Sequence, residues 1–184
     1  MLKTRGLAQV ALFAALIAVG AFLRVPVPVV PFTLQFLFTT LAGLLLGSRR
    51  GALSVLCYLA LGLCGLPIFA AGGGPAYVLQ PSFGYLLGFA LGAWLTGRLA
   101  ERAAVPSLRR LLAAGFAGLA VVYALGMLYY WVICHDVLGT GLAFRTLFLY
   151  CFVLAVPGDI ALCLVAALLG KRLIPLLRKG RIPS

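Results

Sequence analysis

Acidic residues are almost absent from this sequence, and charged residues of either sign are few. Only Glu101, Asp136 and Asp159 carry a carboxylate, and charged side chains make up 10% of the 184 residues, whereas soluble chains average about 25%. Hydrophobic residues make up 64%, which excludes a soluble globular domain. Because each membrane crossing takes roughly 20 residues, the chain has room for about six helices and no soluble catalytic domain.

The shortage of acids leaves a formal net charge of +12, which in a soluble protein would suggest a nucleic-acid partner. Here the basic residues form short clusters between long apolar runs, and no soluble face is available to carry a charged stripe. Nucleic acid is therefore excluded as a partner, and membrane lipid is expected around the chain.

Signature motifs of catalysis, metal binding and nucleotide binding are also missing. The five cysteines are an odd number without a Cys-x-x-Cys pair, so neither a disulfide framework nor a metal site is predicted. No His-Glu-x-x-His, Gly-x-Ser-x-Gly or Walker pattern occurs. His135 and Asp136 are a proton-handling pair without a third group beside them. We predict a protein that is not an enzyme, has no cofactor and has no ATP site of its own.

Six apolar runs, separated by charged or Pro/Gly-rich segments, predict an all-α integral membrane bundle. They cover residues 7–23, 32–47, 51–71, 83–99, 111–133 and 144–170. The alternating strands of about ten residues that build a membrane β-barrel are absent. We therefore expect a single domain of residues 1–184 with six transmembrane helices.

Basic residues are distributed unequally between the two sides of this bundle. Thirteen of the fifteen Lys and Arg residues lie in the N-terminus, the second and fourth connections and the C-terminal tail, whereas Arg24 and Arg145 lie on the other side. Cytoplasmic segments carry the excess of Lys and Arg. Both termini are therefore predicted to be cytoplasmic.

The outer connections 25–31 and 72–82 are rich in Pro and Gly and carry no charge. An exposed loop has no reason to avoid charge, whereas irregular backbone at membrane depth is stable only where it is covered or lines a cavity. We therefore expect both loops, with Gly73 in the second of them, to cap an outward-facing pocket.

Asp159 is the most informative single residue, because it lies inside the last apolar run. A carboxylate at the centre of a bilayer costs about 2.5–3.5 kcal/mol, so this side chain must face the interior of the bundle. Pro157 and Gly158, just before it, can bend the helix and open space. Asp159 would either contact a ligand or bond backbone N–H groups that a structural kink leaves free.

Three polar and two aromatic side chains complete the predicted pocket: Gln35, Gln80, Ser82, Tyr85 and Tyr123. Amide groups both donate and accept hydrogen bonds, so they suit a ligand with a urea or amide head. Interfacial solvation or bonding between helices is the alternative role of these polar side chains. The two tyrosines lie deeper than Tyr130 and Trp131, which are predicted to belong to the interfacial aromatic belt.

Small residues recur every four positions, a spacing that lets helices approach closely. Gly84, Gly88 and Gly92 form one ridge, for which packing inside the bundle is predicted. Ala11 and Ala15 form another near the cytoplasmic end of the first helix. This second face could instead dock a partner subunit.

Taken together and in order, these motifs resemble the BioY family, the biotin-binding S-components of energy-coupling factor (ECF) transporters. The resemblance covers essentially the whole chain, and each motif is weak alone but specific in combination. The segments that carry it are Ala11-Leu-Phe-Ala-Ala15, Val30-Pro-Phe-Thr-Leu-Gln35, Leu41-Ala-Gly-Leu-Leu-Leu-Gly47, Gly72-Gly-Gly74, Gln80-Pro-Ser-Phe-Gly-Tyr85, Val122-Tyr-Ala-Leu-Gly126 and Pro157-Gly-Asp159.

The resemblance implies an S-component fold in a prokaryotic cell membrane, with biotin bound in a pocket that opens outward under the first and third loops. It also implies that the alanine face of helix one docks on a transmembrane coupling protein, with two ATPase subunits supplying the energy. Asp159 matches the aspartate of the family's Pro-Gly-Asp motif, which fits a hydrogen-bonding role toward the ureido N–H groups of biotin.

The chain departs from the family pattern at Leu162. Family members commonly have a lysine at this position, suited to the carboxylate of the ligand, and a buried carboxylate without a cation binds poorly. Either another cation serves, Arg24 and Arg145 being the ones predicted on the outer side, or the ligand differs at that end. The alternative ligand is a biotin-like carboxylate such as lipoate or a biotin precursor. Arg145 is included among the predicted substrate-binding residues.

Two other function classes fit a small membrane bundle. A membrane enzyme acting on a lipid or polyprenyl substrate would need at least two catalytic polar groups on one side, and Asp159 stands alone. A channel would need a polar stripe on several helices, which these runs do not provide, and a scaffolding subunit would bind no vitamin. The sequence favours the substrate-binding subunit of a vitamin transporter.

Overall fold

The protein, in a computed structural model, is described over residues 4–25, 32–103, 106–139, 145, 148–153 and 155–179. Six α-helices lie within these ranges, and the predicted all-α bundle is thereby confirmed. They are α1 (Thr4–Phe22), α2 (Gln35–Leu46), α3 (Ser48–Leu63), α4 (Phe83–Ala100), α5 (Leu108–Val132) and α7 (Val156–Lys179).

Short elements occupy the connections between these helices. An antiparallel pair of two-residue strands, β1 (Arg24–Val25) and β2 (Phe32–Thr33), follows α1. The 3₁₀-helix η1 (Pro75–Leu79) lies between α3 and α4, and the π-helical turns η2 (Ile133–Val137) and η3 (Leu149–Val153) lie between α5 and α7.

Among the described residues, three helical stretches are long and apolar enough to cross a membrane: Thr4–Phe22, Leu108–Val137 and Val156–Leu177. The helix Gln35–Leu46 is apolar but shorter. Large apolar side chains remain exposed on the outside of the bundle, such as Leu12 on α1, Leu128 on α5 and Leu168 on α7. In water this surface would be unfavourable, and it is the surface expected of a multi-pass membrane protein.

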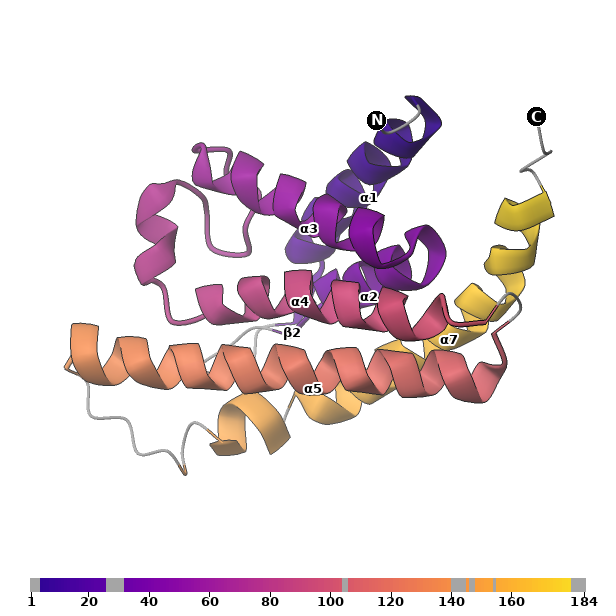
Figure 1. The fold of residues 1–184 in the computed structure, drawn as a ribbon. Helices are drawn as coiled ribbons and strands as arrows, with labels where there is room; N and C mark the ends of the chain where they lie inside the picture. The colour runs from indigo at the N-terminus through magenta and orange to yellow at the C-terminus, as the bar shows by residue number, and fades with distance from the viewer. Residues whose placement is uncertain are drawn as a thin grey trace.

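The glycine ridge of α4 packs against α5, as predicted, and the two helices run side by side (Figure 1). A Cβ atom on Gly88 would lie 2.9 Å from the Cα atom of Val122, and one on Gly92 would lie 3.1 Å from the carbonyl oxygen of Gly118. The first distance is shorter than Cβ contacts in proteins, and the second is tighter than most of them. The contact between α4 and α5 therefore depends on direct approach of the two backbones.

The third helix ends earlier than the apolar run 51–71 predicts. It stops at Leu63, because Gly65 adopts a left-handed φ of +107° and Pro67 cannot continue a helix. The rest of the run forms a loop in which Phe69 is 1% exposed. The loop is exposed at residues 64–67 and at Ala71, with Phe69 as its buried anchor, and Ala70 and Ala71 line the cavity.

The last helix also differs from the prediction of a single helix over residues 144–170. The described part of this stretch contains the π-helical turn Leu149–Val153, and α7 begins only at Val156. Proline is tolerated in the first turn of a helix, where its missing N–H is not needed. Pro157 therefore starts a helix where the sequence predicted a bend, and Asp159 lies in the first turn of α7.

The connections of the bundle segregate to two ends. The start of α1, the α2–α3 and α4–α5 connections and the end of α7 lie toward the upper right of Figure 1. At that end the Ser48 hydroxyl donates a 2.8 Å hydrogen bond to a Glu101 carboxylate oxygen. Opposite them lie the α3–α4 connection and the end of α5, joined by the Tyr129 hydroxyl, which donates to the carbonyl oxygen of Val78 at 2.5 Å.

Candidate functional site

A cavity lies between the two outer loops and the helices beneath them. Its polar and ionisable lining comes from β2, α2, the α3–α4 connection, α4, α5 and α7, and consists of Thr33, Gln35, Tyr77, Ser82, Tyr85, Tyr123 and Asp159. Ala71, which is exposed, marks its rim, and Asp159 lies among its buried lining residues. The α3–α4 connection, which contains the predicted loop 72–82, caps this cavity. Residues 26–31 of the other predicted loop lie outside the described residues, so its place over the cavity stays a prediction.

Asp159 and Tyr123 form the polar pair of the cavity. The Tyr123 hydroxyl, from the middle of α5, donates a 2.5 Å hydrogen bond to Oδ2 of Asp159. The aspartate is 8% exposed and lies in the first turn of α7, where the positive end of the helix dipole stabilises a carboxylate. A carboxylate carries two acceptor oxygens, so this group can accept from Tyr123 and from the N–H of a ligand.

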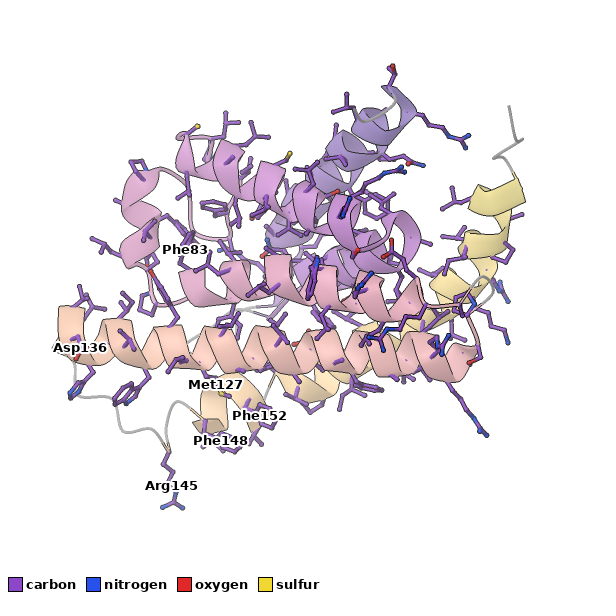
Figure 2. The ribbon with its side chains drawn as sticks, in the orientation of Figure 1. Phe83, Met127, Asp136, Arg145, Phe148 and Phe152 are labelled. Atoms are coloured by element: carbon purple, nitrogen blue, oxygen red, sulfur yellow. The ribbon has the colours of Figure 1, made fainter. Side chains whose placement is uncertain are left out.

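Aromatic rings form the wall beside this pair. The rings of Tyr85 and Tyr123 meet edge to face, with their centroids 5.9 Å apart, and the ring of Phe152 meets Tyr123 in the same way at 5.4 Å. A Cβ atom on Gly126 would overlap the Tyr85 ring, so the ring can pack here only because residue 126 is glycine. Figure 2 shows Phe152 beside Phe148 below α5, where their rings stack at 4.9 Å.

Gln35 is held by its own network at the start of α2. Its Nε2 donates a 2.8 Å hydrogen bond to the Tyr58 hydroxyl, which donates in turn to the carbonyl oxygen of Ile68 at 3.1 Å. The Thr33 hydroxyl donates a 3.4 Å hydrogen bond to Oε1 of Gln35. Tyr58 and Thr33 are not among the residues that the sequence predicts for the pocket. A phenol inside an apolar run needs a buried partner, and that signal could have pointed to Tyr58.

Buried aromatic side chains fix the α3–α4 connection over the cavity. The ring of Phe69 lies 5.3 Å from that of Tyr58 and 4.6 Å from that of Tyr77, centroid to centroid. The Arg24 guanidinium, from the connection that follows α1, donates a hydrogen bond to the carbonyl oxygen of Ala70. The first and third loops are therefore linked directly to each other.

The structure brings five of the eight predicted substrate-binding residues to the cavity: Gln35, Ser82, Tyr85, Tyr123 and Asp159. Gly73 and Gln80 are exposed in the α3–α4 connection and are not among the residues that line it. Arg145 is exposed, and Figure 2 shows its side chain pointing away from the bundle. The roles of these residues toward a ligand stay predictions.

The remaining sequence-based expectations lie outside the cavity. Trp131 is 40% exposed, but Tyr130 is 8% exposed and packs into the core, so assigning Tyr130 to the interfacial belt was wrong. The His135 ring stacks on Trp131 with centroids 5.4 Å apart, and Asp136 lies at the end of the bundle (Figure 2). Within the described ranges, no three His, Cys, Asp or Glu side chains cluster to suit a metal ion.

The helix-one residues predicted to dock a partner lie on the outside of the bundle. Ala11 and Ala15 are exposed on α1, whereas Ala14, between them, is 5% exposed and packs into the core. The spacing of the alanines thus separates an outward face from an inward one. Docking by the outward face stays a prediction.

Comparison with known proteins gives matches over nearly the whole chain. The model of the BioY family matches residues 1–179. A Lysinibacillus sphaericus protein named probable biotin transporter BioY is 44% identical over 179 residues, which is 97% of this chain and 91% of the relative. The biotin transporter BioY of Thermotoga maritima is 42% identical over 170 residues, 92% of this chain and 95% of the relative.

A solved structure matches at the level of the fold. It is the crystal structure of the S-component for biotin from an ECF-type ABC transporter, with a TM-score of 0.80 and 25% sequence identity. The match covers 94% of each of the two chains.

Proposed function

This chain belongs to the BioY family, and from that premise we propose that it is the substrate-binding membrane subunit of a vitamin uptake transporter, with biotin as its ligand. The observation that carries the proposal is the pair formed by Asp159 and Tyr123 in a cavity that the α3–α4 connection caps. The proposed role is binding and translocation, without a chemical reaction on the ligand.

The chemistry of biotin suits the two kinds of surface in this cavity. Its ureido N–H groups are donors, and the Asp159 carboxylate is a buried acceptor that Tyr123 already orients. Its thioether ring and aliphatic chain are apolar, and Phe36, Phe89 and Val122 supply apolar lining. Small-molecule sites are commonly built this way, with a mostly apolar wall and a few polar groups that fix orientation.

Transport requires partners, because the chain has no ATP motif of its own. We propose that an ECF coupling protein docks on the face of α1 that carries Ala11 and Ala15, and that two ATPase subunits supply the energy. Biotin would be captured from outside and released inward when these partners reorient the subunit. This cycle places the protein in a prokaryotic cell membrane with both termini cytoplasmic, and gives ATP a role only through the partners.

A second candidate ligand is a related carboxylate such as lipoate or a biotin precursor. It is considered because Leu162 packs partly buried against the core at the position where the family commonly carries a lysine. The carboxylates of lipoate and of biotin lack that lysine equally, so the two ligands are separated at their other end. Lipoate has a carboxylate but no ureido group. It would therefore leave the Asp159 acceptor unused, whereas biotin would engage it.

Equilibrium binding to the purified, detergent-solubilised protein tests the proposal. Biotin and lipoate are titrated in parallel, and nanomolar binding of biotin with much weaker binding of lipoate is expected. Uptake of labelled biotin by cells that express the chain with and without an ECF module then tests the dependence on partners. Binding of lipoate in place of biotin would overturn the choice of ligand, and binding of neither would overturn the proposed function.

A further inference from the structure

Arg24 lies at the rim of the cavity, fixed there by two contacts. Its backbone pairs with that of Thr33 in the β1–β2 ladder, and its guanidinium donates a hydrogen bond to the carbonyl oxygen of Ala70. Both Thr33 and Ala70 line the cavity. The side chain itself is exposed, so its charged group lies where the cavity meets the outside.

The distribution of charge among the described residues sets the position of Arg24 apart from that of the other basic residues. Among the side chains that line the cavity, Asp159 is the one that carries a formal charge, and Leu162 supplies none. The basic clusters of the chain lie at the opposite end of the bundle, as the helix ends in Figure 1 show. Arg145 points away from the bundle (Figure 2). Arg24 is therefore the cation, within the described ranges, that the fold places beside the cavity.

We propose that Arg24 binds the carboxylate of the ligand at the mouth of the cavity, while Asp159 binds the opposite, N–H-bearing end inside it. This inference rests on the proposed function, because it requires a ligand with a carboxylate. A guanidinium carries five N–H donors in a planar fork. Nη1 can therefore hold Ala70 while the remaining donors face a carboxylate, the partner that this fork matches in geometry.

The arrangement accounts for the lysine that this chain lacks. A cation placed on α7 beside Asp159 would serve a carboxylate inside the bundle, whereas Arg24 serves one at the rim. Binding at the rim also connects the first loop, the third loop and the ligand through one side chain.

Substitution of Arg24 separates this role from a purely structural one. The structural alternative is that Arg24 only links the two loops through Ala70. Loss of that link would weaken binding of every ligand to the same extent, whatever its charge. Loss of a contact to the carboxylate would weaken binding of the acid and leave binding of its neutral amide nearly unchanged.

The experiment measures the dissociation constants of biotin and biotin amide for the wild-type chain and for Arg24→Gln, Arg24→Lys, Arg145→Gln and Arg109→Gln. The last variant removes the same charge from an exposed position at the start of α5, on the opposite end of the bundle. Size-exclusion profiles and melting temperatures establish that each variant is folded. If Arg24→Gln is unfolded, the comparison rests on Arg24→Lys, which keeps the charge but loses the planar fork.

We expect the wild-type chain and Arg109→Gln to bind biotin more tightly than its amide. In Arg24→Gln, biotin affinity should fall about twofold to fivefold, the value of an ion pair at an exposed site, and the preference for the acid should vanish. Arg24→Lys should reduce that preference in part. Because the site is exposed, the preference of the wild-type chain should also shrink as salt is raised.

Three outcomes would overturn the inference and leave the proposed function standing. They are equal wild-type affinity for biotin and its amide, an unchanged preference in Arg24→Gln, and loss of the preference in Arg145→Gln in place of Arg24→Gln. Failure of the wild-type chain to bind either biotin or biotin amide would instead overturn the proposed function, and this inference with it. The binding of the wild-type chain therefore tells the two failures apart.

Discussion

Asp159 must be stable in the bundle before any ligand arrives, and two neighbours provide that stability. The Tyr123 hydroxyl donates to its carboxylate, and the start of α7 lends it the positive end of a helix dipole. Both contacts also fix the direction of the carboxylate. A ligand then meets an acceptor that is already oriented, so the entropy cost of ordering the carboxylate on binding is smaller.

Replacement of this carboxylate tests whether it binds ligand. Asp159→Asn keeps the shape and still accepts from Tyr123, but it removes the charge and turns an NH₂ donor toward the donors of the ligand. Biotin affinity should fall about tenfold to a hundredfold while the melting temperature changes little. Isothermal titration of the purified variant measures the loss. An unchanged dissociation constant would return Asp159 to a structural role.

Tyr123→Phe extends the same test through a double-mutant cycle. If the phenol acts on the ligand through Asp159, the loss in the double variant should be smaller than the sum of the two single losses. Independent roles would make the two losses add. The cycle therefore distinguishes a residue that positions the carboxylate from one that contacts the ligand on its own.

At the scale of single residues, the sequence predicted which polar side chains matter better than it predicted which neighbours they contact. Asp159 could be placed inside the bundle, because a carboxylate in an apolar run has few alternatives. Tyr58 could not be linked to Gln35, because that bond depends on how α2 and α3 are rotated against each other. The same limit separates Arg24 from Arg145: the sequence placed both on one side, and the structure brings only the first of them to the cavity rim.

At the scale of helices, the contact between α4 and α5 determines the geometry of the site. Tyr85 comes from α4 and Tyr123 from α5, so the angle between their rings depends on how closely these helices approach. The glycines of α4 allow that approach, and Gly126 of α5 makes room for the ring of Tyr85. The packing of α4 against α5 therefore determines the shape of the cavity wall that Tyr85 and Tyr123 form.

Gly88→Ala should destabilise the bundle, because its Cβ atom would lie 2.9 Å from the Cα atom of Val122, where the neighbour is backbone and cannot move aside. Overpacking of this kind costs about 1–3 kcal/mol, and the melting temperature in detergent measures it. Gly115→Ala is the matched control on α5. Its Cβ atom would meet Cys163 Sγ at 3.4 Å and Thr40 Cγ2 at 3.8 Å.

The control should be neutral or stabilising, since alanine favours a helix over glycine by up to about 1 kcal/mol. Equal melting temperatures for the wild type and Gly88→Ala would show that the two helices separate without cost. In that case the glycine ridge would not hold α4 against α5.

Helix existence was predictable from the apolar runs, but helix ends were not. The runs match α1 and α4 closely, because charged or proline-containing segments flank them. Residues 64–71 are equally apolar, yet they form a loop, because Gly65 takes a left-handed φ and Pro67 cannot continue the helix. Hydrophobicity alone does not reveal where such a helix ends.

At the scale of the whole molecule, the outward face of α1 is available for a partner. Ala15→Trp should leave biotin binding in detergent unchanged but stop uptake, because a large side chain keeps a docked subunit from close approach. Leu168→Trp is the matched control, since Leu168 is 54% exposed on α7 and away from α1. Normal uptake in Ala15→Trp would remove this face from the coupling mechanism.

The separation of the connections into two ends supplies the last prediction, which concerns the orientation of the whole bundle. Basic residues flank the connections at one end, and the cavity lies toward the other. By the positive-inside rule we expect the basic end to be cytoplasmic. The cavity then faces the outside, where a vitamin to be imported would be captured.

Labelling of single cysteines tests this orientation, and the chain already contains one suitable probe. Cys64 is exposed at the end of α3, and Arg102 is exposed at the α4–α5 connection. In a cysteine-free background, a membrane-impermeant maleimide should label restored Cys64 in intact cells, whereas it should label Arg102→Cys only after permeabilisation. The reverse pattern would place the basic end outside, and a cavity that opens to the cytoplasm could not capture an external vitamin.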